Sequence, residues 1–125
     1  MKTLRILFFS LILSTSMMSV NSYAGAEKYG QEITSRKITE VKDILADPKA
    51  LEGKLVTIEG KIESECSTGC WFYVKVGSGN LTIYVDTGKS GFAIPQKMGR
   101  NILVEGNVVV KKTGPMIQAK GVEIK

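Results

Sequence analysis

A predicted β-hairpin limits most strongly what this chain can fold into. Two runs of β-branched and aromatic residues, 71–76 and 81–86, flank a four-residue segment that contains two glycines. A two-residue turn at Ser78 and Gly79 brings apolar residues of the two runs opposite each other. These pairs are Val76 with Leu81, Val74 with Ile83, and Phe72 with Val85. On the other face the same register pairs Trp71 with Asp86, Tyr73 with Tyr84, and Lys75 with Thr82. The hairpin is therefore expected to bury one face and to carry aromatic and polar groups on the other.

Three more segments alternate apolar and polar residues, as half-buried strands do: residues 56–63, 101–111 and 115–125. Gly60, inside the first segment, predicts a bend or a bulge. In the last segment, the apolar residues before and after Lys120 have opposite parity. This change of parity predicts a bulge near Lys120 and Gly121.

One helix and one irregular connection complete the pattern. Apolar residues at positions 38, 41, 44 and 45 share one helical face, and Asp47 with Pro48 is expected to end the helix. Residues 87–100 include three glycines and a proline, which predicts an irregular crossover. Phe92 and Ile94 of this crossover are expected to fill the core.

Together these elements predict a mainly β fold of five strands with one N-terminal helix, in a single domain over residues 38–125. The mid-strand glycines, the hairpin of strands two and three, and the long link before strand four resemble the OB-fold. That fold is a five-stranded Greek-key barrel. The resemblance is to its variant with a helix before the first strand.

At a finer level, the chain resembles a family of small secreted bacterial OB-fold proteins of unassigned function. The resemblance rests on landmarks that occur in the same order along the chain. They are Tyr29 with Gly30, then Gly53, Lys54, Val56 and Gly60, then Gly69, Cys70 and Trp71 with Cys66 upstream, then Gly91, Phe92, Pro95 and Gly99. The resemblance implies the fold and export, and it implies little chemistry.

The N-terminus predicts an exported protein, periplasmic or secreted. Lys2 and Arg5 precede an apolar stretch over residues 6–20, and residues 22–24 form a small-x-small cleavage signature. Cleavage is expected after Ala24, with Ala26 as the alternative. The apolar stretch is shorter than the roughly 20 residues that span a bilayer, so we expect a removed signal peptide over residues 1–24 and no stable membrane insertion after cleavage. Residues 25–37 are expected to form an N-terminal arm that is loosely ordered or docks late.

Charge and composition exclude several functions. The chain's 17 Lys and Arg include Lys2 and Arg5, so 15 remain against 12 Asp and Glu after cleavage, a net charge of +3. Such a weak and dispersed positive charge argues against a nucleic-acid partner. The chain has no histidine, which excludes Ser-His-Asp and Cys-His catalysis and every histidine-containing metal site. We expect a protein that is not an enzyme.

Cys66 and Cys70 are the only cysteines. In an extended strand they would lie about 13 Å apart, whereas a disulfide needs Cα atoms within about 7 Å. Gly69 and the intervening Ser67 and Thr68 favour a turn, which would bring the thiols together. An even cysteine count in an oxidising compartment favours a disulfide. A ring of about five residues would add only about 2 kcal/mol of stability, so shaping the loop is its more natural role.

Two other roles for this pair stay open. Two thiolates could hold copper or zinc, with Glu63, Glu65, Met98 and Met116 as possible accessory ligands. A Cys-x-x-x-Cys pair resembles the copper loop of exported copper-delivery proteins, but their flanking proline and distant histidine are absent here. Thiol redox chemistry needs a helix N-terminus or a cation near the thiol, and the next cation after Cys70 is Lys75.

The aromatic face of the hairpin is the expected ligand site. In OB-folds this face binds oligonucleotides and oligosaccharides, and here it would carry Trp71, Tyr73, Tyr84 and Lys75. Lys89, Lys97 and Arg100 could form a polar rim. Alternatively, the rings could pack under the N-terminal arm or the helix. The expected partner is a small molecule, an oligosaccharide or an exported protein, with single-stranded nucleic acid as a less suitable alternative.

Overall fold

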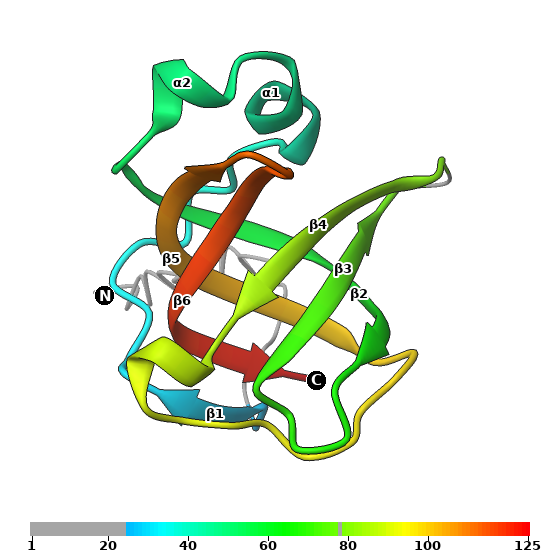
Figure 1. The fold of residues 1–125 in the computed structure, drawn as a ribbon. Coiled ribbons are helices and arrows are strands. Elements are labelled where there is room, and N and C mark those ends of the chain that lie inside the picture. The colour runs from blue at the N-terminus through cyan, green and yellow to red at the C-terminus, as the bar shows by residue number, and fades with distance from the viewer. Residues whose placement is uncertain (1–24, 78) are drawn as a thin grey trace, which may run out of the picture.

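A closed β-barrel forms the body of the protein in a computed structural model that describes residues 25–77 and 79–125. The predicted signal peptide and Ser78 lie outside the described residues. The strands are β1 (Glu27–Gly30), β2 (Leu55–Glu65), β3 (Trp71–Val76), β4 (Leu81–Asp86), β5 (Asn101–Lys111) and β6 (Gly114–Ile124). The sheet order is β1-β6-β4-β3-β2-β5, and pairing of β5 with β6 closes the barrel. The predicted mainly β, five-stranded barrel is confirmed for β2 to β6 (Figure 1).

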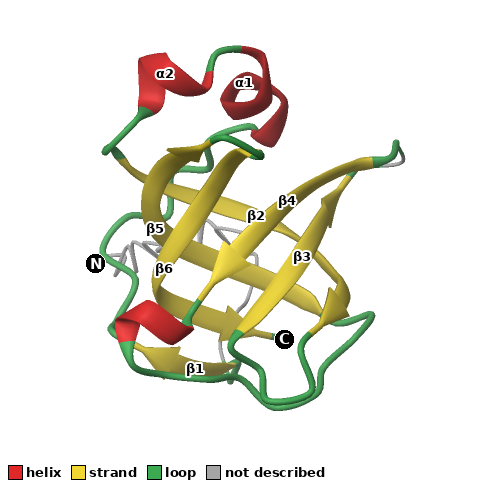
Figure 2. Cartoon of the chain, in the orientation of Figure 1, coloured by secondary structure: helices red, strands yellow, loops and turns green. Residues whose placement is uncertain are grey.

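The helical elements lie outside the barrel wall. They are α1 (Val41–Ala46), α2 (Pro48–Leu51) and the 3-10 helix η1 (Gly88–Ser90). Figure 2 shows α1 and α2 at one end of the barrel, with η1 and the crossover at the other end. Val41 and Ile44 of α1 are buried against the core, which explains the spacing of the apolar residues along this helix. No helix of the described residues is long and apolar enough to cross a bilayer.

The predicted hairpin register is confirmed at every pair from Trp71 with Asp86 to Val76 with Leu81. The inward-facing side chains of this hairpin are almost fully buried: Phe72, Val74, Ile83 and Val85. Ile94 of the crossover is buried, and Phe92 packs against the same core. Both predicted core positions of the crossover are therefore confirmed.

Two bulges adjust the strands to the barrel. Glu105 pairs with Gly121 while Gly106 pairs with Ala119, so Lys120 is the extra residue, as predicted. In β2 the extra residue is Glu63, because Ile62 pairs with Val74 and Ser64 with Tyr73. The bulge of β2 thus lies beyond Gly60. Gly60 instead allows close approach of β3, since a Cβ there would overlap the carbonyl oxygen of Lys75.

The first helix ends at its C-cap Asp47, as predicted, but it starts later than predicted and a second short helix follows it. The first helix begins at Val41, because Ile38 is part of an extended segment that pairs with Thr57. Pro48 follows the end of that helix and also begins α2, where its missing N–H costs nothing. The Asp47 carboxylate accepts a hydrogen bond from the Ala50 N–H and so caps α2.

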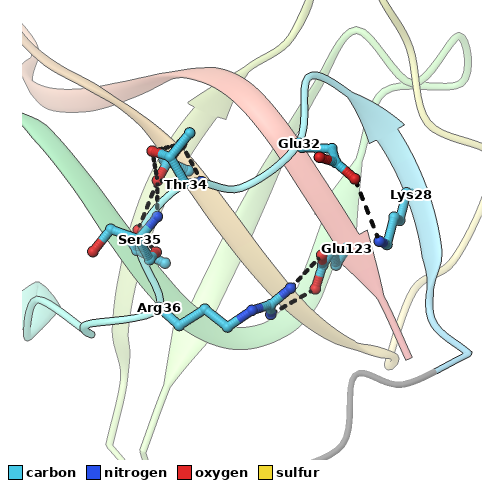
Figure 3. Close-up of polar contacts among 8 residues, drawn as sticks. Lys28, Glu32, Thr34, Ser35, Arg36 and Glu123 are labelled. Atoms are coloured by element: carbon cyan, nitrogen blue, oxygen red, sulfur yellow. Dashed lines mark hydrogen bonds and ion pairs between the residues drawn. The ribbon is translucent and has the colours of Figure 1, made fainter.

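The N-terminal arm is docked on the barrel, as the second of its two expected states has it, and is not loosely ordered in the structure. Its first part is strand β1, which pairs antiparallel with residues 121–124 of β6. Farther along, Glu105 accepts hydrogen bonds from the N–H groups of Thr34 and Ser35 at 3.1 and 2.9 Å. Arg36 makes a two-point ion pair with the buried Glu123 at 2.8 and 2.9 Å (Figure 3). The arm therefore covers the outer face of β5 and β6.

Candidate functional site

The loop of residues 66–70 joins β2 to β3 and brings the two cysteines together. The Gly69 N–H donates to the Cys66 carbonyl at 2.9 Å, which closes a four-residue turn. The Cys66 N–H donates to the Trp71 carbonyl at 2.9 Å, so the two strand ends are joined directly above that turn. The thiols are free, and their sulfur atoms lie 3.3 Å apart. The turn expected from Ser67, Thr68 and Gly69 is present.

Backbone and side-chain groups of the crossover hold this loop in place. The Ile94 N–H and the Thr87 hydroxyl both donate to the Gly69 carbonyl, at 3.1 and 3.0 Å. The Thr87 N–H donates to the Cys70 carbonyl at 3.0 Å. The Gln96 side chain donates to the Cys66 carbonyl at 2.8 Å. Figure 1 shows the loop and the crossover side by side at the end of the barrel away from α1.

The side chain of Thr68 forms hydrogen bonds with both thiols. Its hydroxyl group lies 3.2 Å from the Cys66 sulfur and 3.3 Å from the Cys70 sulfur, within hydrogen-bond reach of both. Hydrogen bonds from the Thr68 hydroxyl, the Thr68 backbone and Cys70 lower the pKa of Cys66 from 9.0 to about 7. Cys66 is therefore partly a thiolate at neutral pH. The sequence suggested a helix N-terminus or a cation as the source of such stabilisation and not the hydrogen bonds within the turn, although the threonine between the two cysteines was a visible signal.

Of the four possible accessory metal ligands, the two glutamates form no metal-holding group with the thiols. Glu65 accepts a hydrogen bond from the Lys97 N–H at 2.6 Å, and Met116 lies buried on β6 opposite Tyr84. Met98 is 61 % exposed, and Glu63 is the exposed bulge residue of β2. Within residues 25–77 and 79–125, no group of three or more Cys, Asp and Glu side chains could hold a metal ion.

Three aromatic rings cluster on the outer face of β3 and β4. Trp71 stacks on Tyr84 with ring centres 5.8 Å apart and planes 25° apart. Tyr73 meets both rings edge-on, at 5.9 Å from Trp71 and 5.3 Å from Tyr84. Tyr73 is 37 % exposed, and the other two rings are half-buried. Burial raises the pKa of Tyr84, and the charge of Asp86 adds to this shift, so its hydroxyl stays a proton donor at neutral pH.

An open cleft of about 510 Å³ lies beside this ring cluster. It forms where β4 and β6 diverge, because these strands pair only over residues 84–86 and 116–118. Its lining includes Tyr73 and Tyr84 of the ring cluster, Pro115 and Met116 of β6, and Leu45 of α1. Thr82, Asp86 and Lys111 add polar groups to the lining. The rings thus extend from the cysteine loop to the cleft.

The basic residues that were predicted to contact the ligand do not line this cleft. Lys75 lines a second hollow of about 540 Å³ together with Lys61, Lys125 and Glu59. Lys97 pairs with Glu27 at 3.4 Å, and Arg100 donates to the Lys125 carbonyl at 2.7 Å. Lys89 is the exposed middle residue of η1. The structure therefore brings Trp71, Tyr73 and Tyr84 together and places Lys75 in a different hollow.

Comparison with known proteins identifies the fold. No protein-family model matches the chain, and no curated protein sequence matches it. The hypothetical protein YgiW from E. coli is similar in structure, with a TM-score of 0.52 and 24% identity over 76% of this chain and 100% of YgiW. The fold is an OB-fold barrel.

Two other solved structures match this chain, one in a small part of a longer protein and one over nearly its whole length. An asparaginyl-tRNA synthetase from Pyrococcus horikoshii, complexed with asparaginyl-adenylate, matches with a TM-score of 0.53 and 15% identity, over 72% of this chain and only 22% of the synthetase. The OBody AM1L10, bound to hen egg-white lysozyme, matches with a TM-score of 0.50 and 20% identity, over 75% of this chain and 96% of the OBody. At these identities the similarity concerns the OB-fold alone.

Proposed function

We propose that this OB-fold protein is an exported, non-enzymatic binding module that takes an oligosaccharide or another small molecule with a flat apolar face. The observation that carries the proposal is the cluster of Trp71, Tyr73 and Tyr84 beside an open cleft of about 510 Å³. A cleft of this size, with aromatic walls and a few polar groups, has the character of small-ligand sites. Asp86, Thr82 and Lys111 would bind ligand hydroxyl groups at its edge.

The proposed export rests on the N-terminal sequence. A basic start, an apolar stretch over residues 6–20 and a small-x-small signature are typical of a signal peptide. The mass of the mature protein tests this directly, with Gly25 or Glu27 as the expected first residue. A protein that keeps Met1 and stays in the cytoplasmic fraction would contradict it.

The weak net charge after cleavage favours a neutral or mildly polar ligand over nucleic acid. A protein partner is the second candidate, because the OBody that this chain resembles is bound to lysozyme. A protein partner would have to place an aromatic or apolar side chain on the same rings. Both candidates therefore depend on the ring cluster.

The test is titration of the protein with soluble chito- and cello-oligosaccharides. Trp71 is the only tryptophan, so its fluorescence reports binding at the cluster. We expect Tyr84→Ala and Trp71→Ala, the latter measured by calorimetry, to weaken binding about tenfold, because one stacked ring contributes roughly 1 to 3 kcal/mol in related stacking sites.

Leu81→Ala is the matched control. It removes an exposed apolar side chain of β4 that does not line the cleft. The control should bind as the wild type does, and all variants should still melt cooperatively. Equal affinity of Trp71→Ala, Tyr84→Ala and wild type would rule out the ring cluster as the ligand site.

A further inference from the structure

The thiols of Cys66 and Cys70 have no role in the proposed stacking of a ligand on the ring cluster. We propose that they are a reversible dithiol–disulfide couple that exchanges with a disulfide-bonded polypeptide. This activity is additional to ligand binding by the ring cluster. It rests on the position of the two sulfur atoms and on the way in which the loop is held.

The distance between the sulfur atoms suits a couple that opens and closes. They lie 3.3 Å apart, and a disulfide bond is about 2.05 Å long. Closing the bond therefore needs an approach of little more than about 1 Å. The ring that closes is small, so it constrains the unfolded chain only slightly and adds little stability to the oxidised form. Both redox forms are thus accessible.

The loop backbone is held from outside the Cys66–Cys70 ring. Ile94 and Thr87 bind the Gly69 carbonyl, while Gln96 binds the Cys66 carbonyl. These bonds end on backbone carbonyls of the loop and do not involve the two sulfur atoms, which form no disulfide. Oxidation or reduction can therefore proceed without rearranging the crossover. Cys70 directly precedes Trp71, the first residue of β3, which stacks on Tyr84. The ring cluster thus offers an apolar surface on which the polypeptide could lie while its disulfide meets the thiols.

Cys66 is the attacking thiol and Cys70 the resolving thiol. The Thr68 hydroxyl and the Cys70 S–H both lie within hydrogen-bond reach of the Cys66 sulfur, and these contacts stabilise its thiolate. Cys70 lies against the first residue of η1, since a Cβ on Gly88 would be 3.5 Å from the Cys70 Cβ.

The exchange balances in two steps. The Cys66 thiolate attacks one sulfur of the polypeptide disulfide, a mixed disulfide forms, and the second polypeptide sulfur leaves as a thiolate that takes a proton. Cys70 then loses its proton and attacks the Cys66 sulfur. The Cys66–Cys70 bond forms, and the first polypeptide sulfur leaves and is protonated. Two electrons pass from the dithiol to the polypeptide, and the reverse sequence oxidises a polypeptide dithiol.

The experiment mixes the reduced full chain with a synthetic peptide that contains one internal disulfide, and follows both species by mass spectrometry. We expect one peptide dithiol for each chain that loses two hydrogen atoms. Cys70→Ser should accumulate a mixed disulfide at Cys66, because the second step is blocked. Cys66→Ser should trap the peptide at least about tenfold more slowly, since it lacks the stabilised thiolate.

Thr68→Val is the positioning control, because it keeps the shape of threonine and removes the hydroxyl. We expect trapping by the Thr68→Val, Cys70→Ser double variant to be several-fold slower than by Cys70→Ser alone, with an unchanged thermal melt. Titration of the wild type with reduced and oxidised glutathione provides a second measurement, in which both forms should be populated. The proposal fails if the peptide disulfide survives the reduced wild type, or if the two single variants trap it equally fast. It also fails if glutathione cannot interconvert the two forms.

Discussion

Gly69 sets the shape of the cysteine loop. Its φ is +71°, a left-handed conformation that favours glycine, and a Cβ there would overlap the Ile94 carbonyl oxygen. We expect Gly69→Ala to lower the free energy of unfolding by about 1 to 3 kcal/mol, because it adds backbone strain and displaces the crossover. Urea denaturation measures this change. Gly79→Ala is the control, since nothing lies within 4 Å of a Cβ at that turn residue, and its effect should stay within about 0.5 kcal/mol. Equal effects of the two substitutions would contradict the role of Gly69.

Cys66 carries the prediction that depends most directly on pH. Hydrogen bonds from Thr68 and from Cys70 lower its pKa to about 7, and alkylation proceeds through the thiolate. We expect the iodoacetamide reaction at Cys66, followed by peptide mass spectrometry, to rise with pH and to reach half of its maximum near pH 7. Thr68→Val should move this midpoint to higher pH because the largest stabilising hydrogen bond is lost. A midpoint near 9 in the wild type would contradict the arrangement of the turn.

The N-terminal arm differs more than any other element from the structure that its polar sequence indicates. Burial alone would raise the pKa of Glu105, but hydrogen bonds from Thr34 and Ser35 outweigh burial, and the pKa falls below its ordinary value of 4.5. A carboxyl group with a lowered pKa in the folded state stabilises the protein fully above its unfolded-state pKa. That stabilisation is lost as the pH falls through the folded-state pKa.

Glu105→Gln tests this docking. Because the 3 % exposed carboxylate serves several donors of the arm, we expect its loss to lower the free energy of unfolding at pH 7 by about 2 kcal/mol. The difference from wild type should shrink when both are unfolded near pH 3. Glu40→Gln is the control, since that side chain makes no capping hydrogen bond to α1. A difference that is equally large at both pH values would show that charge plays no part in holding the arm.

At the scale of the whole molecule, barrel closure assembles the proposed site from distant parts of the chain. The ring cluster comes from β3 and β4, while other lining residues of the cleft come from the start of β6 and from the end of β5 with the turn between them. The crossover after β4 returns to hold the cysteine loop, because β4 must be linked to β5 on the other side of the sheet. The same connection that completes the barrel thus positions the thiols beside the rings.

Several features of the fold were predictable because their causes are local. The register of β3 and β4 follows from a short turn and the alternation of apolar residues, and it places Trp71, Tyr73 and Tyr84 on one face. The bulge at Lys120 follows from the change of parity between Ala119 and Val122, which are both buried. The turn between the cysteines follows from its glycine and its short polar residues.

The remaining features depend on contacts between residues far apart in the sequence. Glu105 and Glu123 occupy alternate strand positions that indicate solvent, yet both are buried because the arm docks over them. The lowered pKa of Cys66 depends on the orientation of Thr68 within a turn held by the crossover.

The sequence by itself determined the five strands of the barrel, the hairpin register and the proximity of the thiols to the aromatic rings, since spacing along one segment decides these. The tertiary structure alone decided where the arm lies, which hollow receives Lys75 and how the cysteine loop is held. These depend on hydrogen bonds and burial between segments up to 87 residues apart, such as the ion pair of Arg36 with Glu123. Periodicity along a single segment carries no information about them.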